Sequence, residues 1–270
     1  MRILEMTREH SPILTENLDG GIAKVVLNNP PLNVVTLRMS ERLLETMNDL
    51  EGDESVRAVV LTGAGHKAFC AGADIKEFPS VRDRVVEKKL ARENEAFGAI
   101  ESLSKPVVAA IEGLAFGGGC EVALACDLRL AAEDARFALP EVKLGVLPGS
   151  GGLYRLPELV GPARALELMY LGEPISAGEA ESMGLLNRVV PKGRALEHAI
   201  ALAREIARRP RDAVAAIKQG VRGSSGLSRA EAVRLTLELS ERVFLSDDAV
   251  EGYEAFVEKR EPRFSGVDEG

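Results

Sequence analysis

The chain has 270 residues, of which 46% are hydrophobic and 28% are charged. This composition is typical of a globular protein and excludes a disordered or fibrous chain. The net charge of −8, with basic residues mixed among acids, argues against the one-signed basic patch that a nucleic acid partner requires. No apolar run approaches the roughly 20 residues of a membrane span, and the N-terminus lacks the apolar stretch of a signal peptide. We therefore expect a cytoplasmic protein without a membrane partner.

The cysteines and histidines show no spacing typical of a metal site. The cysteines form no CxxC pair and lie among small residues, which predicts buried, unbridged thiols: Cys70, Cys120 and Cys126. The histidines lie far apart and form no HxxxH or HExxH motif: His10, His66 and His198. We therefore expect neither disulfides nor a bound metal.

Short β-branched runs alternate with stretches of helical period over the first 190 residues. Residues 22–29 and 57–63 predict strands, and residues 37–50 between them predict a helix whose apolar side chains share one face. The pattern continues, with further strands expected at 105–113, 128–132 and 187–191, and further helices at 88–103, from the glycines at 117–119 onward, at 162–171 and at 176–184. Strands joined mostly by helices predict an α/β protein.

The strands stop near residue 196, and four helical segments follow: 196–208, 211–222, 228–245 and 247–259. Two S-x-x-E sequences predict capping boxes at helix starts: Ser176 with Glu179, and Ser228 with Glu231. We expect a core of residues 1–195 and a helical region of residues 196–270 that serves assembly. The alternative, that these helices cover one end of the same core, stays open.

Three glycine-rich stretches carry partial matches to known motifs. Residues 62–68 match the G-x-G-x-x-A form of a dinucleotide fingerprint, but no helical stripe follows them, which disfavours that interpretation. Residues 113–121, GLAFGGGCE, lack the Lys-Ser/Thr of a phosphate-binding loop. Ser150 in LPGSGG has no G-x-S-x-G context, which argues against a serine hydrolase.

The glycines at 117–119 lie between a predicted strand and a predicted helix. Free N–H groups in the first turn of such a helix can bind a negatively charged oxygen. Alternatively, the glycines only allow the helix to pack tightly on the sheet. Glu121 lies among apolar residues in the same turn, where burial makes a carboxylate hold its proton more tightly than usual. The alternative for Glu121 is an acid placed favourably at a helix N-terminus.

A second acid in an apolar setting is Glu141, which follows Pro140 at the end of the strand-like run RFAL. Two such carboxylates beside glycine-rich backbone are the groups needed to move protons next to a stabilised oxyanion. Their spacing in the sequence does not show that they meet in space.

Several linked segments resemble the crotonase family, the enoyl-CoA hydratase/isomerase superfamily. The resemblance runs from about residue 20 to the C-terminus and rests on AFCAGADIKEF (68–78), KPVVAAIEGLAFGGGCEVALACDLRLAA (105–132), FALPEVKLGVLPGSGG (137–152), GEPISAGEA, MGLLNRVVP and FVEKREPRF. It implies an α/β fold, a spiral of repeated ββα units with a C-terminal helical trimerisation region. It also implies a homo-oligomer, either a trimer or a hexamer made of two trimers.

The resemblance implies roles for four residues. Ala73 and Gly118 match the positions whose backbone N–H groups form the family's oxyanion hole for a thioester carbonyl. Glu121 and Glu141 match the two catalytic glutamates of the hydratases, which hold a water molecule between them. The sequence does not assign which glutamate acts first.

Other residues match the family's acyl-CoA site. Asp74, Ile75 and Lys76 fall, together with Ala73, in the segment that lines this site. Lys259 resembles a C-terminal lysine that reaches the phosphates of coenzyme A, and a solvated surface lysine is the alternative. The resemblance implies no cofactor, because coenzyme A is part of the substrate.

We therefore expect an enoyl-CoA hydratase, which adds water across the double bond of a 2-enoyl-CoA thioester to give the 3-hydroxyacyl-CoA. An enoyl-CoA isomerase or another crotonase-fold acyl-CoA lyase is one alternative, and a non-catalytic CoA-binding, assembly or RNA-binding protein is another. The acyl chain stays unassigned. Leu153 and Tyr154 depart from the common GGTQRL pattern, and residues 79–95 fall where members of the family often have a mobile segment beside the acyl chain.

Overall fold

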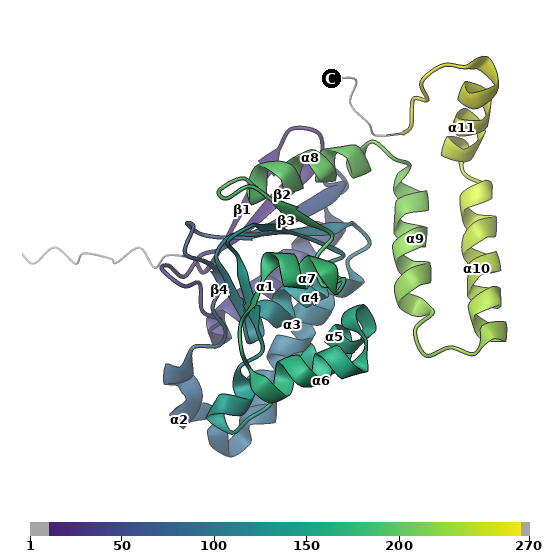
Figure 1. Ribbon diagram of the computed structural model, residues 1–270. Coiled ribbons are helices and arrows are strands. Elements are labelled where there is room, and N and C mark those ends of the chain that lie inside the picture. The colour runs from purple at the N-terminus through teal and green to yellow at the C-terminus, as the bar shows by residue number, and fades with distance from the viewer. Residues whose placement is uncertain (1–10, 266–270) are drawn as a thin grey trace, which may run out of the picture.

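Two β-sheets form the centre of the molecule (Figure 1). The computed structural model describes residues 11–265. The larger sheet has the strand order β1 (Ile13–Leu18), β2 (Ile22–Leu27), β3 (Ala58–Gly63), β5 (Val107–Ile111), β7 (Leu128–Ala132) and β10 (Arg188–Val190). The smaller sheet has the order β4 (Ala68–Cys70), β6 (Leu114–Phe116), β8 (Arg136–Ala138) and β9 (Ile175–Ser176). Neighbouring strands are parallel except in the pairs β1–β2 and β8–β9.

The helices follow the strands in a repeated order. They are α1 (Leu37–Gly52), α2 (Phe78–Val81), α3 (Ala91–Ser102), α4 (Gly118–Ala125), α5 (Gly152–Val160), α6 (Pro162–Leu171), α7 (Ala177–Ser182), α8 (Ala195–Ala207), α9 (Arg211–Gly223), α10 (Arg229–Phe244) and α11 (Asp247–Glu258). Both predicted capping boxes form, at the starts of α7 and α10. Within residues 11–265, no helix is long and apolar enough to cross a membrane.

The chain alternates between the two sheets. Each of β3, β5 and β7 in the larger sheet is followed by a strand of the smaller sheet, β4, β6 or β8, and then by helices. This repeat of two strands and a helical stretch confirms the spiral α/β fold. Five of the six strands of the larger sheet were predicted from their apolar runs, whereas β1 was missed, as were β4, β6 and β9 of the smaller sheet.

The larger sheet separates two layers of buried apolar side chains. On β3, Val59 and Leu61 face the larger layer, while Ala58 and Val60 face the smaller one, as the two-residue period of a strand requires. The larger layer packs the sheet against helices that include α1, α3 and α4. The sheet is therefore covered on both faces, which explains the continuous apolar runs in its strands.

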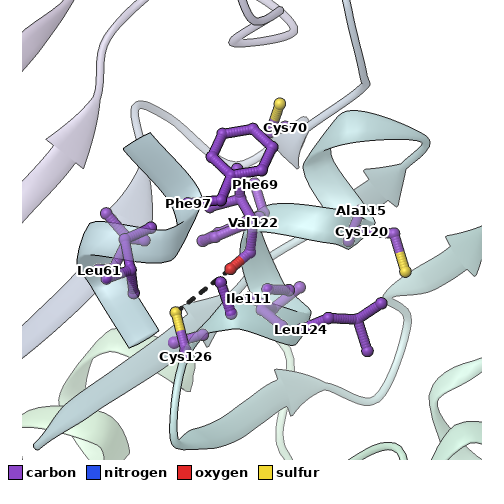
Figure 2. Packing of buried hydrophobic residues seen from close by; sticks show 14 of the residues in the cluster. Leu61, Phe69, Cys70, Phe97, Ile111, Ala115, Cys120, Val122, Leu124 and Cys126 are labelled. Atoms are coloured by element: carbon purple, nitrogen blue, oxygen red, sulfur yellow. Dashed lines mark hydrogen bonds between the residues drawn. The ribbon is translucent and has the colours of Figure 1, made fainter. Parts of the chain in front are cut away.

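The three cysteines are part of the larger apolar layer (Figure 2). All three are free and buried, which confirms the prediction of unbridged thiols. The Cys126 thiol lies 3.5 Å from the carbonyl oxygen of Val122, one helical turn earlier. Burial raises the pKa of Cys70 and of Cys126 to about 12, so these thiols stay protonated and pack as small apolar side chains.

The C-terminal helices divide into two parts. The small side chains of α8, including Ala199 and Ala203, pack against the larger sheet on the face opposite α1, so α8 belongs to the core layer. Helix α9 is attached to the edge of the core by Lys218 and Arg222, which pair with Asp127, and α10 and α11 lie farther from the sheets (Figure 1). Large apolar side chains on these three helices are exposed: Ile217, Val221, Leu237, Phe244, Leu245, Tyr253 and Phe256. We call α9–α11 the arm.

Candidate active site

Three of the predicted site segments follow three neighbouring strands of the smaller sheet. Ala73 comes after β4, Gly118 directly after β6 and Glu141 after β8. These strands are adjacent and parallel, so their carboxyl ends lie at the same edge of the sheet. Ligands of open parallel sheets commonly bind beyond such carboxyl ends. The topology thus brings together residues that are up to 68 positions apart in sequence.

Two backbone N–H groups, those of Ala73 and Gly118, lie next to each other at this edge. A Cβ atom built on Gly118 would lie 3.7 Å from the backbone nitrogen of Ala73. Val35 accepts from the N–H of Asp74 and donates to the carbonyl of Gly72, so Ala73 between them points its own N–H away from Val35. Neither N–H group has a backbone acceptor among residues 11–265. The pair is available to a ligand oxygen.

Each glycine before Glu121 has a different steric role. A side chain on Gly119 would meet the carbonyl oxygen of Cys70 at 2.0 Å, so this glycine allows α4 to pack on β4. Gly117 has a φ of +50°, and a Cβ there would lie 2.9 Å from Glu141 Oε1. The tight-packing interpretation therefore holds for Gly119, and the oxyanion role of Gly118 stays a prediction.

Glu121 lies on the first turn of α4 and is 2% exposed. Its Oε1 atom accepts hydrogen bonds from the N–H groups of Ser150 and Gly152, both at 2.8 Å. The pKa of Glu121 is raised to about 7, mainly by burial and also by the charges of Glu141 and Glu93, against the lowering effect of the two N–H donors. The carboxyl group can therefore take up or release a proton near neutral pH.

Glu141 begins the 3₁₀ turn η4 (Glu141–Leu144). Its Oε2 atom is buried and has no hydrogen-bond partner among the described residues, while its Oε1 atom faces Gly117. Burial raises the pKa of this carboxyl, against the opposing effect of its own backbone N–H. The structure brings Glu141 close enough to Glu121 for its charge to affect the second carboxyl.

The remaining predicted binding residues divide into two groups. Asp74 caps the short turn η1 (Ile75–Glu77) by accepting from the N–H of Lys76 at 3.0 Å, and Ile75 is exposed beside it. These residues directly follow Ala73. Lys259 instead follows α11 on the arm, far from α4 within one chain (Figure 1). The structure therefore does not bring Lys259 to the other site residues.

Two polar residues next to Glu121 were missed as site residues. Ser150 and Glu93 are 1% and 3% exposed, and the Ser150 hydroxyl donates to Glu93 Oε2 at 2.6 Å. A signal for Glu93 is present in the sequence. It occupies the core-facing stripe of its helix, three residues after Leu90 and four before Phe97, where a solvated acid is not expected.

The residues expected to shape the acyl pocket lie beside this network. Leu153 and Tyr154, on the first turn of α5, are 52% and 49% exposed. Leu90, in the π-helical turn η3 (Val86–Leu90), packs on Gly149, where an added Cβ would lie 3.0 Å from a Leu90 methyl carbon. A helix was predicted from residue 88, and α3 itself begins at Ala91.

Comparisons with known proteins agree with this geometry. Residues 17–267 match the model of the enoyl-CoA hydratase/isomerase family. The chain is 40% identical over 251 residues to a probable enoyl-CoA hydratase of Bacillus subtilis, covering 92% of this chain and 97% of the relative. It is 39% identical to carnitinyl-CoA dehydratase of Proteus mirabilis, with 92% and 96% covered. The crystal structure of enoyl-CoA hydratase from Bacillus anthracis, 38% identical, superposes with a TM-score of 0.90 over 94% of this chain and 99% of that one. The chain therefore belongs to the enoyl-CoA hydratase/isomerase family.

Proposed function

We propose that this protein is an enoyl-CoA hydratase, which adds water across the double bond of a 2-enoyl-CoA thioester to give the 3-hydroxyacyl-CoA. One observation carries the proposal. Two carboxyl groups with raised pKa, the buried Glu121 and the half-buried Glu141, lie beside two adjacent N–H groups that have no backbone acceptor among residues 11–265. The names of the Bacillus relatives support the same activity.

The N–H groups of Ala73 and Gly118 form the oxyanion hole in this proposal. Attack of water on Cβ moves an electron pair toward the thioester, so the carbonyl oxygen gains enolate charge. Two fixed donors stabilise that charge more than the neutral carbonyl, and removal of one such donor typically raises a barrier by about 3 kcal/mol. The positive end of α4 points at the same oxygen through the Gly118 N–H.

The two glutamates move the protons. A water molecule held between Glu121 and Glu141 forms the bond from its oxygen to Cβ and gives one proton to a glutamate carboxylate. Cα receives a proton from a glutamic acid, so the sum of the steps is the addition of one water. Because the pKa of Glu121 is about 7, its acid and base forms are both populated near neutral pH, as general acid–base catalysis requires.

Glu121 is oriented for this role by its backbone donors. Its Oε1 atom is held by Ser150 and Gly152, so Oε2 is the oxygen left to bind water. Glu141 has a buried Oε2 with no partner among residues 11–265, which can accept a hydrogen bond from the same water. An unpaired buried acceptor is unfavourable in the empty site, and a bound water removes this penalty.

Substrate binding and assembly complete the proposal. Ala73, Asp74, Ile75 and Lys76 line the acyl-CoA site beyond β4. Lys259 lies on the arm, so a contact with the phosphates of coenzyme A requires a second copy of the chain. We propose a trimer or a hexamer of two trimers, in which the exposed apolar side chains of the arm are covered.

The test is a hydration assay with crotonyl-CoA, followed by the loss of the conjugated enoyl-thioester absorbance. We expect the wild type to be active. Glu121→Gln and Glu141→Gln are each expected to lower kcat by at least about 100-fold, because each removes a group that exchanges a proton in the reaction. Glu95→Gln, an exposed acid on α3, is the matched control and keeps wild-type activity.

Two outcomes would count against the proposal. A wild type that is inert on short, medium and branched 2-enoyl-CoA thioesters is not a hydratase. A wild type that converts a 3-enoyl-CoA into its conjugated 2-enoyl isomer but releases no hydroxyacyl-CoA is an isomerase, which needs only one proton-transfer group.

A further inference from the structure

A chain of buried polar contacts lies behind Glu121, on the side of α3. Ser150 donates its backbone N–H to Glu121 Oε1 and its hydroxyl to Glu93 Oε2. Glu93 Oε1 lies 3.2 Å from the ammonium of Lys89, which also binds Glu77 at 2.9 Å. Ser150, Glu93 and Lys89 are each less than a tenth exposed. Burying a carboxylate and an ammonium beside the apolar core is unfavourable unless both are paired, so this set of contacts is a specific arrangement.

Two further contacts connect the loop of residues 149–152 to α3, one directly and one through Arg155. Asn94 donates to the carbonyl of Gly149 at 2.8 Å, next to the Glu93 contact with Ser150. Arg155 donates to the carbonyl of Ser150 at 3.2 Å and is fixed by Glu101 at 2.7 and 2.9 Å. The loop that supplies both N–H donors to Glu121 is thereby attached to the first and the last turn of one helix.

The hydroxyl of Ser150 donates directly to a buried carboxylate, that of Glu93. Hydrogen bonds with an ionised partner are shorter and stronger than neutral ones, and the 2.6 Å distance between Ser150 Oγ and Glu93 Oε2 has that character. If the hydroxyl is lost, Glu93 keeps only Lys89, and the peptide of Ser150 loses its side-chain anchor. The N–H groups at 150 and 152 would then hold Glu121 Oε1 less firmly.

We propose that Glu93 and Ser150 are positioning residues: Glu93 holds the Ser150 hydroxyl, and this contact fixes the loop whose N–H groups orient the Glu121 carboxyl group. Neither residue touches the reacting atoms. The inference rests on the proposed function only for its activity readout, because the orientation of Glu121 can be measured without substrate.

The first experiment measures the pKa of Glu121 by infrared spectroscopy, with its carboxyl band assigned by the loss of that band in Glu121→Gln. Ser150→Ala is expected to raise this pKa, because the N–H bonds that favour the ionised form loosen. Glu93→Gln is expected to lower it, because a neighbouring negative charge disappears while the amide still accepts from Ser150. The other groups that act on Glu121 are Glu141 and the two backbone donors, and both variants keep them.

The second experiment measures crotonyl-CoA hydration. Ser150→Ala is expected to lower kcat roughly tenfold with KM within about twofold, the effect of losing one hydrogen bond to a charged group. In the double variant of Ser150→Ala with Glu93→Ala, which removes the acceptor, kcat should fall by less than the product of the two single effects, because each substitution breaks the same contact. Glu95→Gln is the control on the same helix. Thermal unfolding of each variant distinguishes a loss of folding from a shift of the Glu121 carboxyl group in a folded protein.

The outcomes separate this inference from the proposed function. Unchanged kcat and unchanged pKa of Glu121 in a folded Ser150→Ala variant would overturn the positioning role, whatever the wild type catalyses. Fully multiplicative kcat effects in the double variant would overturn the shared contact. An inert wild type whose Glu121 pKa still moves in opposite directions in the two variants would refute the hydratase and support the positioning role.

Discussion

Glu121 occupies a position where its two protonation states differ strongly in solvation. The side chain is 2% exposed, and burial is the main cause that raises its pKa to about 7. The two N–H donors on Oε1 offset part of this effect, so the carboxyl group titrates close to neutral pH rather than far above it. An acid with this balance can serve a reaction that needs both a proton donor and a proton acceptor.

The raised pKa of Glu121 makes stability depend on pH. Its folded-state value of about 7 lies above the ordinary 4.5, so the folded state binds this proton more tightly than the unfolded state. The resulting stabilisation is fully present below about pH 4.5 and is lost as the pH rises through about 7. Relative to Glu121→Gln, which cannot titrate, we expect the wild type to lose roughly 2 kcal/mol of unfolding free energy between about pH 5 and pH 8.

Urea unfolding of both proteins at the two pH values, at one protein concentration, measures this difference. Glu95→Gln supplies the comparison for an exposed acid, and its difference from the wild type should not change with pH. A constant difference between wild type and Glu121→Gln would show that Glu121 titrates as an ordinary glutamate.

At the scale of elements, the contact of α4 with β4 decides where Gly118 and Glu121 lie. This contact depends on Gly119, whose Cα is so near the carbonyl of Cys70 that a Cβ would come within 2.0 Å of the oxygen. The close approach is backbone against backbone, so a larger residue cannot be accommodated by rotation of a side chain. The first turn of α4, with its free N–H group, is therefore positioned by a glycine that takes no part in the chemistry.

We expect Gly119→Ala to lower the unfolding free energy by at least about 2 kcal/mol and to abolish hydration, because α4 must shift away from β4. Gly178→Ala is the matched control: this glycine lies in α7, is exposed, and has no atom within 4 Å of an added Cβ. It should gain about 0.5–1 kcal/mol from helix propensity and keep its activity. Thermal unfolding measures the stability of both variants, and the crotonyl-CoA assay measures their activity. A Gly119→Ala protein as stable as wild type would contradict the packing argument.

At the scale of the whole molecule, the arm is the feature that a single chain leaves incomplete. Phe244 and Leu245 are each 80% exposed and Phe256 is 85% exposed, all on helices that extend from the core. Apolar side chains gathered in this way mark an interface more often than a free surface. Lys259 follows the last of these helices, so assembly through the arm and delivery of Lys259 to a neighbouring site are compatible parts of one proposal.

We expect the double substitution Phe244→Glu with Leu245→Glu to lower the molar mass measured by light scattering from a trimer or hexamer toward one chain, because two charges would be buried in the interface. Leu14→Glu is the control, an exposed leucine on the edge strand β1. A wild type with the mass of a single chain at micromolar concentration would remove the assembly role of the arm.

Local patterns were sufficient for most helices and for every strand of the larger sheet except β1, because apolar period and capping residues act over a few positions. The apolar neighbours of Glu121 likewise predicted its burial and its raised pKa, both of which the structure confirms. The family resemblance named Ala73, Gly118 and Glu141 as its companions, and their roles stay predictions.

Which of these residues are neighbours depends on contacts between distant parts of the chain. The parallel pairing of β4, β6 and β8, which no local pattern in these short strands specifies, places Ala73, Gly118 and Glu141 at one edge. The contact of Glu93 with Ser150 joins residues 57 positions apart, and no local pattern specifies it. Most elements and the acid in an apolar turn could be predicted from local residues, because those features depend on nearby side chains. The site depends on strand pairing and helix packing, which are long-range contacts that become defined only when the whole chain folds.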